Sequence, residues 1–242
     1  MFFYIFKLEK GSDYDPKSHF INFSGNISNF KFEISNLNSE NLIQENIDSG
    51  IEDYKFINQK IVTGILTIIK TVRLNEVEIP KTSEIPFILR LGSEFAFIKT
   101  SKEIERIEAC YCLNEWLNIF KIDFKEFIPR RDKVINFVCG GTLNEAKISS
   151  EIGIVDIEEI QELTNDTKKN ILMKYPLIEA DLEFGINNEI ISLFYYGDAL
   201  QFPRDAPLEQ IEIAIQIFEC VMFETSNNNK ENGNNGHIPQ TS

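Results

Sequence analysis

The sequence predicts an α+β fold, in which a mainly antiparallel sheet built from hairpins packs against three to four amphipathic helices. Segments in which apolar and polar residues alternate occur in pairs joined by short turns, as in β-hairpins. Segments with apolar residues three or four positions apart separate these pairs, as in amphipathic helices. Hairpins between helices, rather than single strands, favour antiparallel pairing over the parallel sheet of an α/β fold.

The first third of the chain begins with strand-like segments. Residues 2–6 are aromatic or β-branched, and residues 19–23 and 29–34 alternate apolar and polar side chains. A glycine and an asparagine lie between the latter two segments and suit a turn. The polar residues 35–48 show no clear period, so we expect a loop there.

Residues 49–74 predict one long amphipathic helix. Ser49, followed three positions later by Glu52, is the capping-box pattern of a helix start. The following apolar residues recur at three- and four-residue steps, which places them on one helical face: Ile51, Tyr54, Ile57, Ile61, Ile65, Ile68 and Val72. The many β-branched residues disfavour a helix slightly, but we expect the period to decide.

A hairpin and a second helix follow. Residues 87–91 and 94–99 flank the Gly-Ser pair of a two-residue turn. Thr100 and Glu103 form another capping box. The helix that they begin carries a regular apolar stripe and is expected to end before Pro129.

The middle of the chain predicts several short elements. Residues 133–139 predict a strand that ends at two glycines, and residues 152–155 predict another. Asp156 is placed to cap a helix over residues 157–163, and the helix is expected to restart after residues 164–167.

The clearest hairpin joins residues 178–184 to residues 190–196. Strict alternation in its first strand puts three acidic side chains on one face and apolar side chains on the other. The returning strand is apolar on both faces and should be more deeply buried. Asp205 and Pro207 then begin a final helix with an apolar face: Leu208, Ile211, Ile215, Phe218 and Met222.

No linker-like composition divides residues 1–225, so we expect a single globular α+β domain there. Two intimately packed halves that meet near residue 80 are the alternative. Residues 226–242 are rich in Asn and offer little to bury, which predicts a disordered tail. The chain has no run of about 18 apolar residues, and we expect no membrane association and a cytoplasmic location.

The charge of the chain bears on its partners. It carries 24 Lys and Arg against 38 Asp and Glu, a net charge of −14. Nucleic-acid binding draws its affinity from cationic side chains, so we expect no strong direct binding of nucleic acid by this chain alone. Basic proteins, by contrast, are attracted by such a surface. The sequence contains neither the Walker A pattern nor the dinucleotide-binding pattern, the two glycine-rich patterns that bind phosphates. We therefore expect no cofactor.

The cysteines and histidines predict no metal site. Four cysteines are too sparse for a disulfide framework. Cys110 and Cys112 fall on a predicted helix, where residues two apart lie about 200° apart around the axis and cannot face one ion. The only histidines are His19 and His237.

A row of carboxylates is the first candidate site. Glu179, Asp181 and Glu183 project from one face of one strand, roughly 7 Å apart, and Asp198 and Asp205 follow beyond the hairpin. Acidic oxygens that converge on a sheet face can hold a divalent cation and its nucleophilic water. All of these acids except Glu179 could therefore serve a metal-dependent phosphodiester hydrolase or nuclease. The alternative is a solvated sheet face.

Two charged clusters are further candidates. The acidic side chains of Glu158, Glu159 and Glu162 crowd one short segment and, together with the acids at residues 179–183, predict an interaction surface. A small basic cluster predicts contact with a phosphate or with an acidic partner: Lys125, Arg130, Arg131 and Lys133.

The leading hypothesis is an acidic, non-catalytic interaction protein: a subunit, adaptor or inhibitor that binds a larger, more basic protein, which itself can be nucleic-acid-binding. The negative charge, the scarcity of histidine and the missing catalytic signatures favour it. A place in a defence or toxin-neutralising system fits the same physics. The metal-dependent phosphodiester hydrolase remains the alternative.

Overall fold

The structure, a computed structural model, describes residues 1–10, 32–34, 47–58, 60–74, 77–118, 120–157 and 159–223 of the 242-residue chain. Within these residues an antiparallel sheet packs against four α-helices, which confirms the predicted α+β class. The strand predicted over residues 19–23, most of the predicted loop 35–48 and the predicted tail 226–242 lie outside the described residues.

The strands form one continuous path in which neighbours pair antiparallel. In sheet order they are β2 (Phe32–Ile34), β3 (Ile47–Asn58), β4 (Ile61–Leu74), β5 (Val77–Arg90), β6 (Phe95–Lys99), β1 (Phe2–Lys10), β12 (Ala199–Gln201), β11 (Glu189–Tyr195), β10 (Leu177–Ile186), β8 (Thr142–Ser150) and β9 (Gly153–Ile157). A further strand, β7 (Ile122–Glu126), pairs with β1 outside this path.

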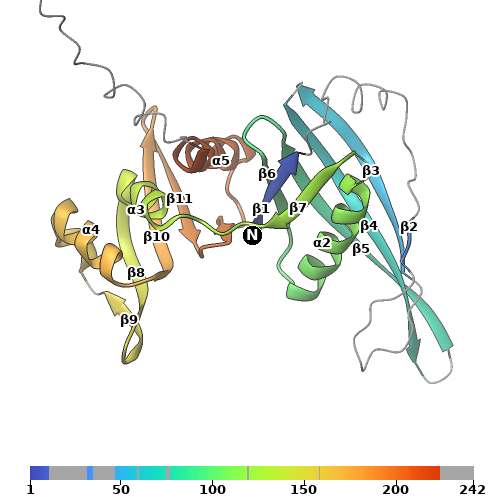
Figure 1. The fold of residues 1–242 in the computed structure, drawn as a ribbon, viewed down its shortest axis with the longest axis horizontal. Helices are drawn as coiled ribbons and strands as arrows, with labels where there is room; N and C mark the ends of the chain where they lie inside the picture. Colours follow the sequence, from blue (N-terminus) through green and yellow to red (C-terminus); the bar gives the residue numbers. More distant parts are fainter. Residues whose placement is uncertain are drawn as a thin grey trace, which may run out of the picture.

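The helices divide between the two parts of the sheet (Figure 1). They are α2 (Glu103–Asn118), α3 (Arg131–Gly140), α4 (Asn165–Lys174) and α5 (Leu208–Phe223), and a short 3₁₀ turn, η2, spans Ile160–Glu162. Helix α2 packs with β1 and with β3 to β7, whereas α3, α4 and α5 pack with β8 to β12, and α5 also packs against β1 and β6. Within the described part of the chain, no helix combines the length and the apolar character needed to cross a membrane.

Strand β1 lies where the two parts meet. It pairs with β12 through its first residues, with β6 through its middle and with β7 through its end. Phe3 and Ile5 belong to one buried cluster, and Phe6 and Leu8 belong to the other. Because successive side chains of a strand point to opposite faces, β1 is buried on both faces, with α5 on one side and α2 on the other.

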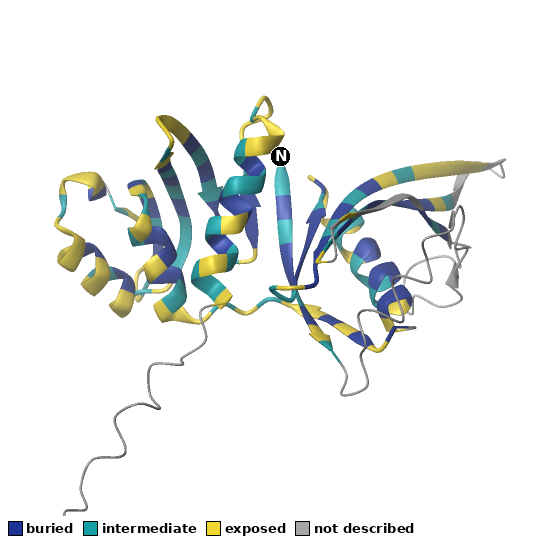
Figure 2. Cartoon of the chain, turned by 90° about the horizontal axis from the view of Figure 1, so that it is seen from above, coloured by how far each residue is buried: buried dark blue, intermediate teal, exposed yellow. Residues whose placement is uncertain are grey.

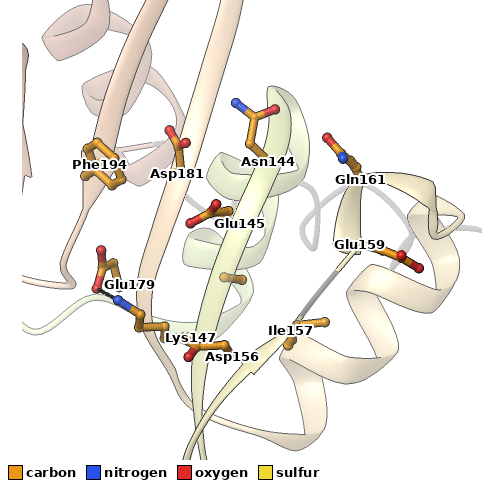
Figure 3. Close-up of a pocket in the computed structure, with 11 residues that line it drawn as sticks. Asn144, Glu145, Lys147, Asp156, Ile157, Glu159, Gln161, Glu179, Asp181 and Phe194 are labelled. Atoms are coloured by element: carbon orange, nitrogen blue, oxygen red, sulfur yellow. Dashed lines mark hydrogen bonds and ion pairs between the residues drawn. The ribbon is translucent and has the colours of Figure 1, made fainter.

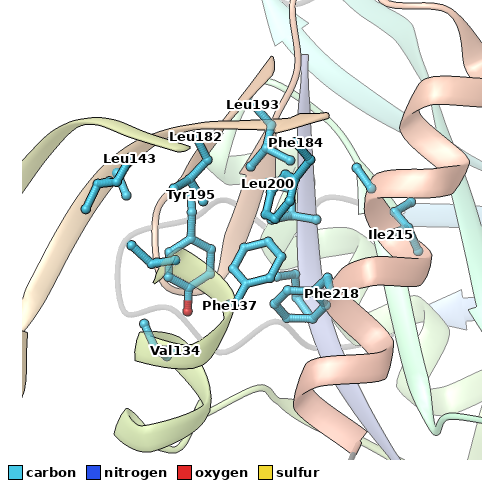
Figure 4. Packing of buried hydrophobic residues seen from close by; sticks show 14 of the residues in the cluster. Val134, Phe137, Leu143, Leu182, Phe184, Leu193, Tyr195, Leu200, Ile215 and Phe218 are labelled. Carbon is cyan, nitrogen blue, oxygen red and sulfur yellow. The ribbon is translucent and has the colours of Figure 1, made fainter. Parts of the chain in front are cut away.

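The two buried clusters are rich in aromatic rings. In the first, Phe218 of α5 is central (Figure 4). Its ring lies 5.3–6.5 Å, centroid to centroid, from five others: Phe95, Phe97, Phe127, Phe137 and Tyr195. In the second, Trp116 of α2 packs edge-on against Phe87 and Phe120. Figure 2 shows that the buried residues of the helices face the strands.

The long helix predicted over residues 49–74 is wrong. The structure forms β3 and β4 there, and β4 continues into a hairpin with β5. Ser49 is not a helix cap but a strand residue opposite Ile68, and it is 3% exposed. The segment is dominated by Ile, Val and Thr, whose branched side chains fit a pleated sheet. With so many apolar positions, a helical period and a strand period both find matches, and here propensity decides.

Two further segments differ from the prediction, one in the type of element and one in where the helix ends. Residues 133–139 belong to helix α3 rather than to a strand, and their buried positions, Val134, Ile135, Phe137 and Val138, have helical spacing. The second predicted helix ends at Asn118, and β7 occupies the stretch before Pro129. The chain turns between them at Lys121, which has a positive φ of 58°. A short apolar run cannot distinguish a strand from a buried helix by period alone.

Several predictions are confirmed. Strands β5 and β6 form the predicted hairpin, although its turn spans the four residues 91–94 rather than two, and β10 and β11 form the clearest hairpin. The latter turns at Asn187 and Asn188, whose φ angles of 51° and 66° suit a tight hairpin turn. The predicted strand at residues 152–155 is β9, and the helix restart is α4, whose N-cap Thr164 accepts a hydrogen bond from the backbone of residue 167. Of the helix predicted over residues 157–163, only η2 forms.

A buried arginine ties α5 to the other part of the sheet. Arg90 of β5 is 4% exposed and forms ion pairs with Glu212 at 2.7 Å and Glu219 at 3.2 Å, both on α5. The Ser93 hydroxyl donates a hydrogen bond of 2.6 Å to Glu219. Burial raises the pKa of Glu219. Removing one member of such a group would leave a charge buried without its partner.

The aromatic cluster gives the first prediction. We expect Phe218→Ala to lower the free energy of unfolding by about 3–5 kcal/mol, because the cavity left by the ring cannot be filled by its neighbours. Urea denaturation followed by circular dichroism measures this loss. Phe223→Ala, which removes a ring that is 43% exposed at the end of the same helix, serves as the control and should cost less than about 1 kcal/mol. Equal losses for the two variants would contradict the central role of Phe218.

The buried arginine gives the second. We expect Arg90→Met to lower the free energy of unfolding by about 3 kcal/mol at pH 7. The raised pKa of Glu219 means that the folded state holds this proton more tightly than the unfolded chain, so its contribution to stability falls as pH rises between the two pKa values. Loss of the cation raises the folded pKa further, so the deficit should shrink at about pH 5.

The matched control is Arg130→Met, which removes an exposed ion pair with Asp132. This change should cost less than about 1 kcal/mol. Thermal or urea unfolding at both pH values tests the pair. A deficit for Arg90→Met that is the same at both pH values would show that the buried carboxylate does not depend on this arginine.

Candidate functional site

The part of the sheet formed by β8 to β12, called here the second part, has one apolar and one polar face. Ala180, Leu182 and Phe184 of β10 are buried among α3, α5 and the neighbouring strands. The alternating residues Glu179, Asp181 and Glu183 point to the opposite face and are partly exposed. The predicted alternation therefore places the three carboxylates on one face of one strand, as expected.

Strand register brings further acids to this face. Asp181 lies directly opposite Glu145 of β8, and Glu179 lies opposite Lys147. Lys147 in turn lies opposite Asp156 of β9. Directly opposed residues share a face and stand about 5 Å apart, so three neighbouring strands contribute carboxylates to one patch. Sequence reasoning put only the acids of β10 on a sheet face and did not place the acids of β8 and β9 beside them.

The patch is hollowed into an open depression of about 390 Å³ (Figure 3). Its wall beyond β9 is the segment that leads into η2, where Glu159 has a positive φ of 54°. Among the described residues, five carboxylates and one ammonium group line it: Glu145, Asp156, Glu159, Glu179, Asp181 and Lys147. We call this hollow the acidic depression.

The single ammonium is already engaged. Lys147 Nζ lies 2.9 Å from Glu179 Oε2, and the hydroxyl of Tyr196 donates a longer hydrogen bond of 3.4 Å to the other oxygen of Glu179. Glu145 and Asp181 form no ion pair within the described part of the chain. Burial and the nearby charge of Glu145 raise the pKa of Asp181. The depression therefore holds negative charge that its own lysine does not balance.

A row of four aromatic rings borders the acidic depression, and sequence reasoning missed it. Tyr4 and Phe2 of β1 stack at 6.1 Å, Phe2 lies 5.6 Å from Tyr196, and Tyr196 stacks on Phe194 at 6.4 Å, all between ring centroids. Phe194 lies directly opposite Asp181, so the row meets the acids at that pair. We call these four residues the aromatic row. In each of the two segments the rings are two residues apart, which places them on one face of a strand, and this spacing is the signal that the sequence contained.

Helix α2 closes the far end of the aromatic row with a cation. The guanidinium of Arg106 lies 5.2 Å from the ring centroid of Tyr4. The same group pairs with Glu103 of its own helix and lies 3.7 Å from Asp198. Its hydrogen bond to Glu103 raises the pKa of Arg106. An arginine held by a ring and two carboxylates is thus already part of this face.

The structure does not bring the four acids predicted for a hydrolase around one point. Asp198 lies in the turn between β11 and β12 and faces Arg106, whereas Asp205 is exposed between β12 and α5. Glu183 is opposite Ser192 and does not line the acidic depression. Within the described residues, no three His, Cys, Asp or Glu side chains are placed to hold a metal ion.

The predicted acidic segment is divided. Glu159 lines the acidic depression, and Glu162 is exposed on η2 without lining it. Glu158 lies outside the described residues.

Two of the four residues of the predicted basic cluster pair with acids of their own surroundings. Lys125 pairs with Glu9 on the neighbouring strand β1, and Arg130 pairs with Asp132. Arg131 donates from Nε to the backbone oxygen of Leu172, 3.0 Å away, which joins α3 to α4. Lys133 lies in the first turn of α3. Contact of this cluster with a phosphate or an acidic partner remains a prediction.

Burial keeps the thiols of the two α2 cysteines, Cys110 and Cys112, protonated. All four cysteines are free. Cys112 is buried on α2, and burial raises the pKa of Cys110 to about 12, which keeps its thiol protonated. The two residues are on one helix, as predicted, with Cys110 less buried than Cys112.

The uncompensated charge predicts an unusual stability effect. Asp181→Asn should raise the free energy of unfolding at pH 7 by a few tenths to about 1 kcal/mol, a small amount because the group is partly exposed. The raised pKa of Asp181 means that its charge costs stability above the ordinary aspartate range. The gain should disappear below that range, where the wild-type side chain is protonated. Urea unfolding at several pH values measures it.

Asp166→Asn is the control of opposite sign. Asp166 lies in the first turn of α4, where a negative charge favours the helix dipole. Its loss should lower stability slightly. A destabilised Asp181→Asn variant would show that the carboxylates of the acidic depression do not repel one another.

Comparison with protein-family models finds no match to this chain, and comparison with curated proteins finds none either.

Proposed function

We propose that this chain is an acidic, non-catalytic interaction protein, a subunit, adaptor or inhibitor that binds a larger and more basic protein in the cytoplasm. The acidic depression is the observation that carries this proposal, since five carboxylates meet there with one lysine that is already paired. Such a surface attracts a basic partner at long range and selects its orientation at contact.

The remaining features support the same proposal. The net charge of −14 extends the attraction beyond the acidic depression. It also opposes direct binding of a phosphate backbone, so a nucleic acid would be reached only through the partner. An inhibitor in a defence or toxin-neutralising system would act by covering the basic surface with which its target binds. Four free cysteines agree with a reducing compartment.

A metal-dependent phosphodiester hydrolase needs its carboxylates around a shared ion. The acids that the sequence suggested for it, Asp181, Glu183, Asp198 and Asp205, are dispersed over a strand, a turn and a loop. No observation on the described residues favours this second function over the first.

The test compares two triple variants. In the first, Glu145→Gln, Asp156→Asn and Asp181→Asn remove three charges from the acidic depression. Partners retained from lysate of the native host by the wild-type chain are identified, and the most abundant basic one is purified. Its affinity for each chain is then measured by calorimetry at low and moderate salt. We expect at least about a tenfold loss for the triple variant and weaker binding at higher salt.

The control removes the same charge elsewhere. Glu84→Gln, Glu115→Gln and Asp166→Asn alter exposed acids that do not line the acidic depression. This variant should retain most of the wild-type affinity. A partner that binds both triple variants alike, or one that binds independently of salt, would refute the proposal.

A further inference from the structure

The polar face of the second part of the sheet carries aromatic rings as well as charged side chains. The inference drawn from this combination rests on the proposed function. The aromatic row adjoins the acidic depression through Phe194, which lines the depression (Figure 3), and no described α-helix contributes a side chain to that lining. Phe194 and Asp181 form the border between them, because they are directly opposed across β11 and β10. A ligand at this border would meet rings and carboxylates at once.

We propose that this border binds an arginine side chain of the basic partner, with its guanidinium stacked on Phe194 and paired with Asp181 and Glu145. Glu145 lies directly beyond Asp181 on the next strand. Opposed side chains stand about 5 Å apart, so a planar cation over the ring of Phe194 would have both carboxylates within reach of its donors.

The state of the neighbouring acids shows where the charge is available. Glu179 is engaged by Lys147 and by the hydroxyl of Tyr196. Asp181 and Glu145 have no such cation in the described part of the chain. Their mutual repulsion, which contributes to the raised pKa of Asp181, would be relieved by an incoming positive charge.

The protein already contains one copy of the proposed contact. At the opposite end of the aromatic row, Arg106 stacks over Tyr4 and meets Glu103 and Asp198. The proposed site repeats this combination of one ring and two carboxylates, and in the described part of the chain no cation pairs with Asp181 or Glu145. These contacts of Arg106 are the observation that favours an arginine, rather than a lysine, as the side chain bound beside Phe194.

Arginine suits this arrangement better than lysine. Its guanidinium is planar, so it stacks on a ring with one face while its edges donate to carboxylates. An ammonium group can satisfy the acids but gains less from the ring. The discrimination between the two cations is therefore the signature of the aromatic row, and attraction of either cation is the signature of the acidic depression.

The test uses three fluorescent hexapeptides of arginine, lysine and citrulline, and the intact chain. Fluorescence anisotropy at moderate salt gives their affinities. We expect hexa-arginine to bind about fivefold or more tightly than hexa-lysine, and hexa-citrulline, which has the shape of arginine without its charge, not to bind. Asp181→Asn combined with Glu145→Gln should remove the binding of both cationic peptides. Glu84→Gln combined with Glu115→Gln is the charge-matched control.

A second pair of variants isolates the ring. Phe194→Leu should weaken hexa-arginine about fivefold and bring it close to hexa-lysine, whose affinity should change little. Phe223→Leu, which alters an exposed ring at the end of α5, should change neither. Circular dichroism melting confirms that each variant folds.

The outcomes separate the inference from the proposed function. Equal affinity for the two cationic peptides, or no effect of Phe194→Leu, overturns the arginine site but leaves an acidic docking surface in place. Absence of binding by either peptide, together with a partner that ignores the acidic depression, overturns both. Tighter binding of a single-stranded oligonucleotide than of hexa-arginine would assign the aromatic row to nucleic acid and would also overturn the inference.

Discussion

The burial of β1 on both faces is the constraint on which the remaining structure depends. Phe3 and Ile5 pack toward α5, while Phe6 and Leu8 pack toward α2. Strand β6 beside it is buried in the same two-sided way. Two strands so enclosed fix the helices to opposite faces, and each part of the sheet is left with one face that its own helices do not cover. The polar face with the carboxylates is one of these.

The fold was predictable where period, turn and composition agree. The β10–β11 hairpin combines strict alternation with a turn of two asparagines, and α5 combines an apolar stripe with a proline at its start. Residues 49–74 were misjudged because isoleucines occupy so many positions that a helical stripe can be drawn through a pair of strands. The strand predicted over residues 133–139 was wrong for the converse reason, since a short apolar run has too few positions to show its period.

The site was predictable only within single strands. The three acids of β10 were found because alternation is a local property. Glu145 and Asp156 join them through the register of β8 with its neighbours, and Phe2 joins Tyr196 across the shared path of β1, β12 and β11. Register between distant segments depends on the assembled core rather than on any local pattern. Neither the acidic depression nor the aromatic row could therefore be drawn from the sequence.

The position of Arg106 carries a mechanical consequence. The arginine belongs to α2, in one part of the molecule, yet it stacks on the first strand and approaches the turn after β11 in the other. A partner segment that follows the aromatic row from Phe194 to this arginine would cross the boundary between the two parts and contact both of them. A partner bound along the aromatic row would then restrict motion between the two parts, and the complex would resist proteases and shear better than the free chain.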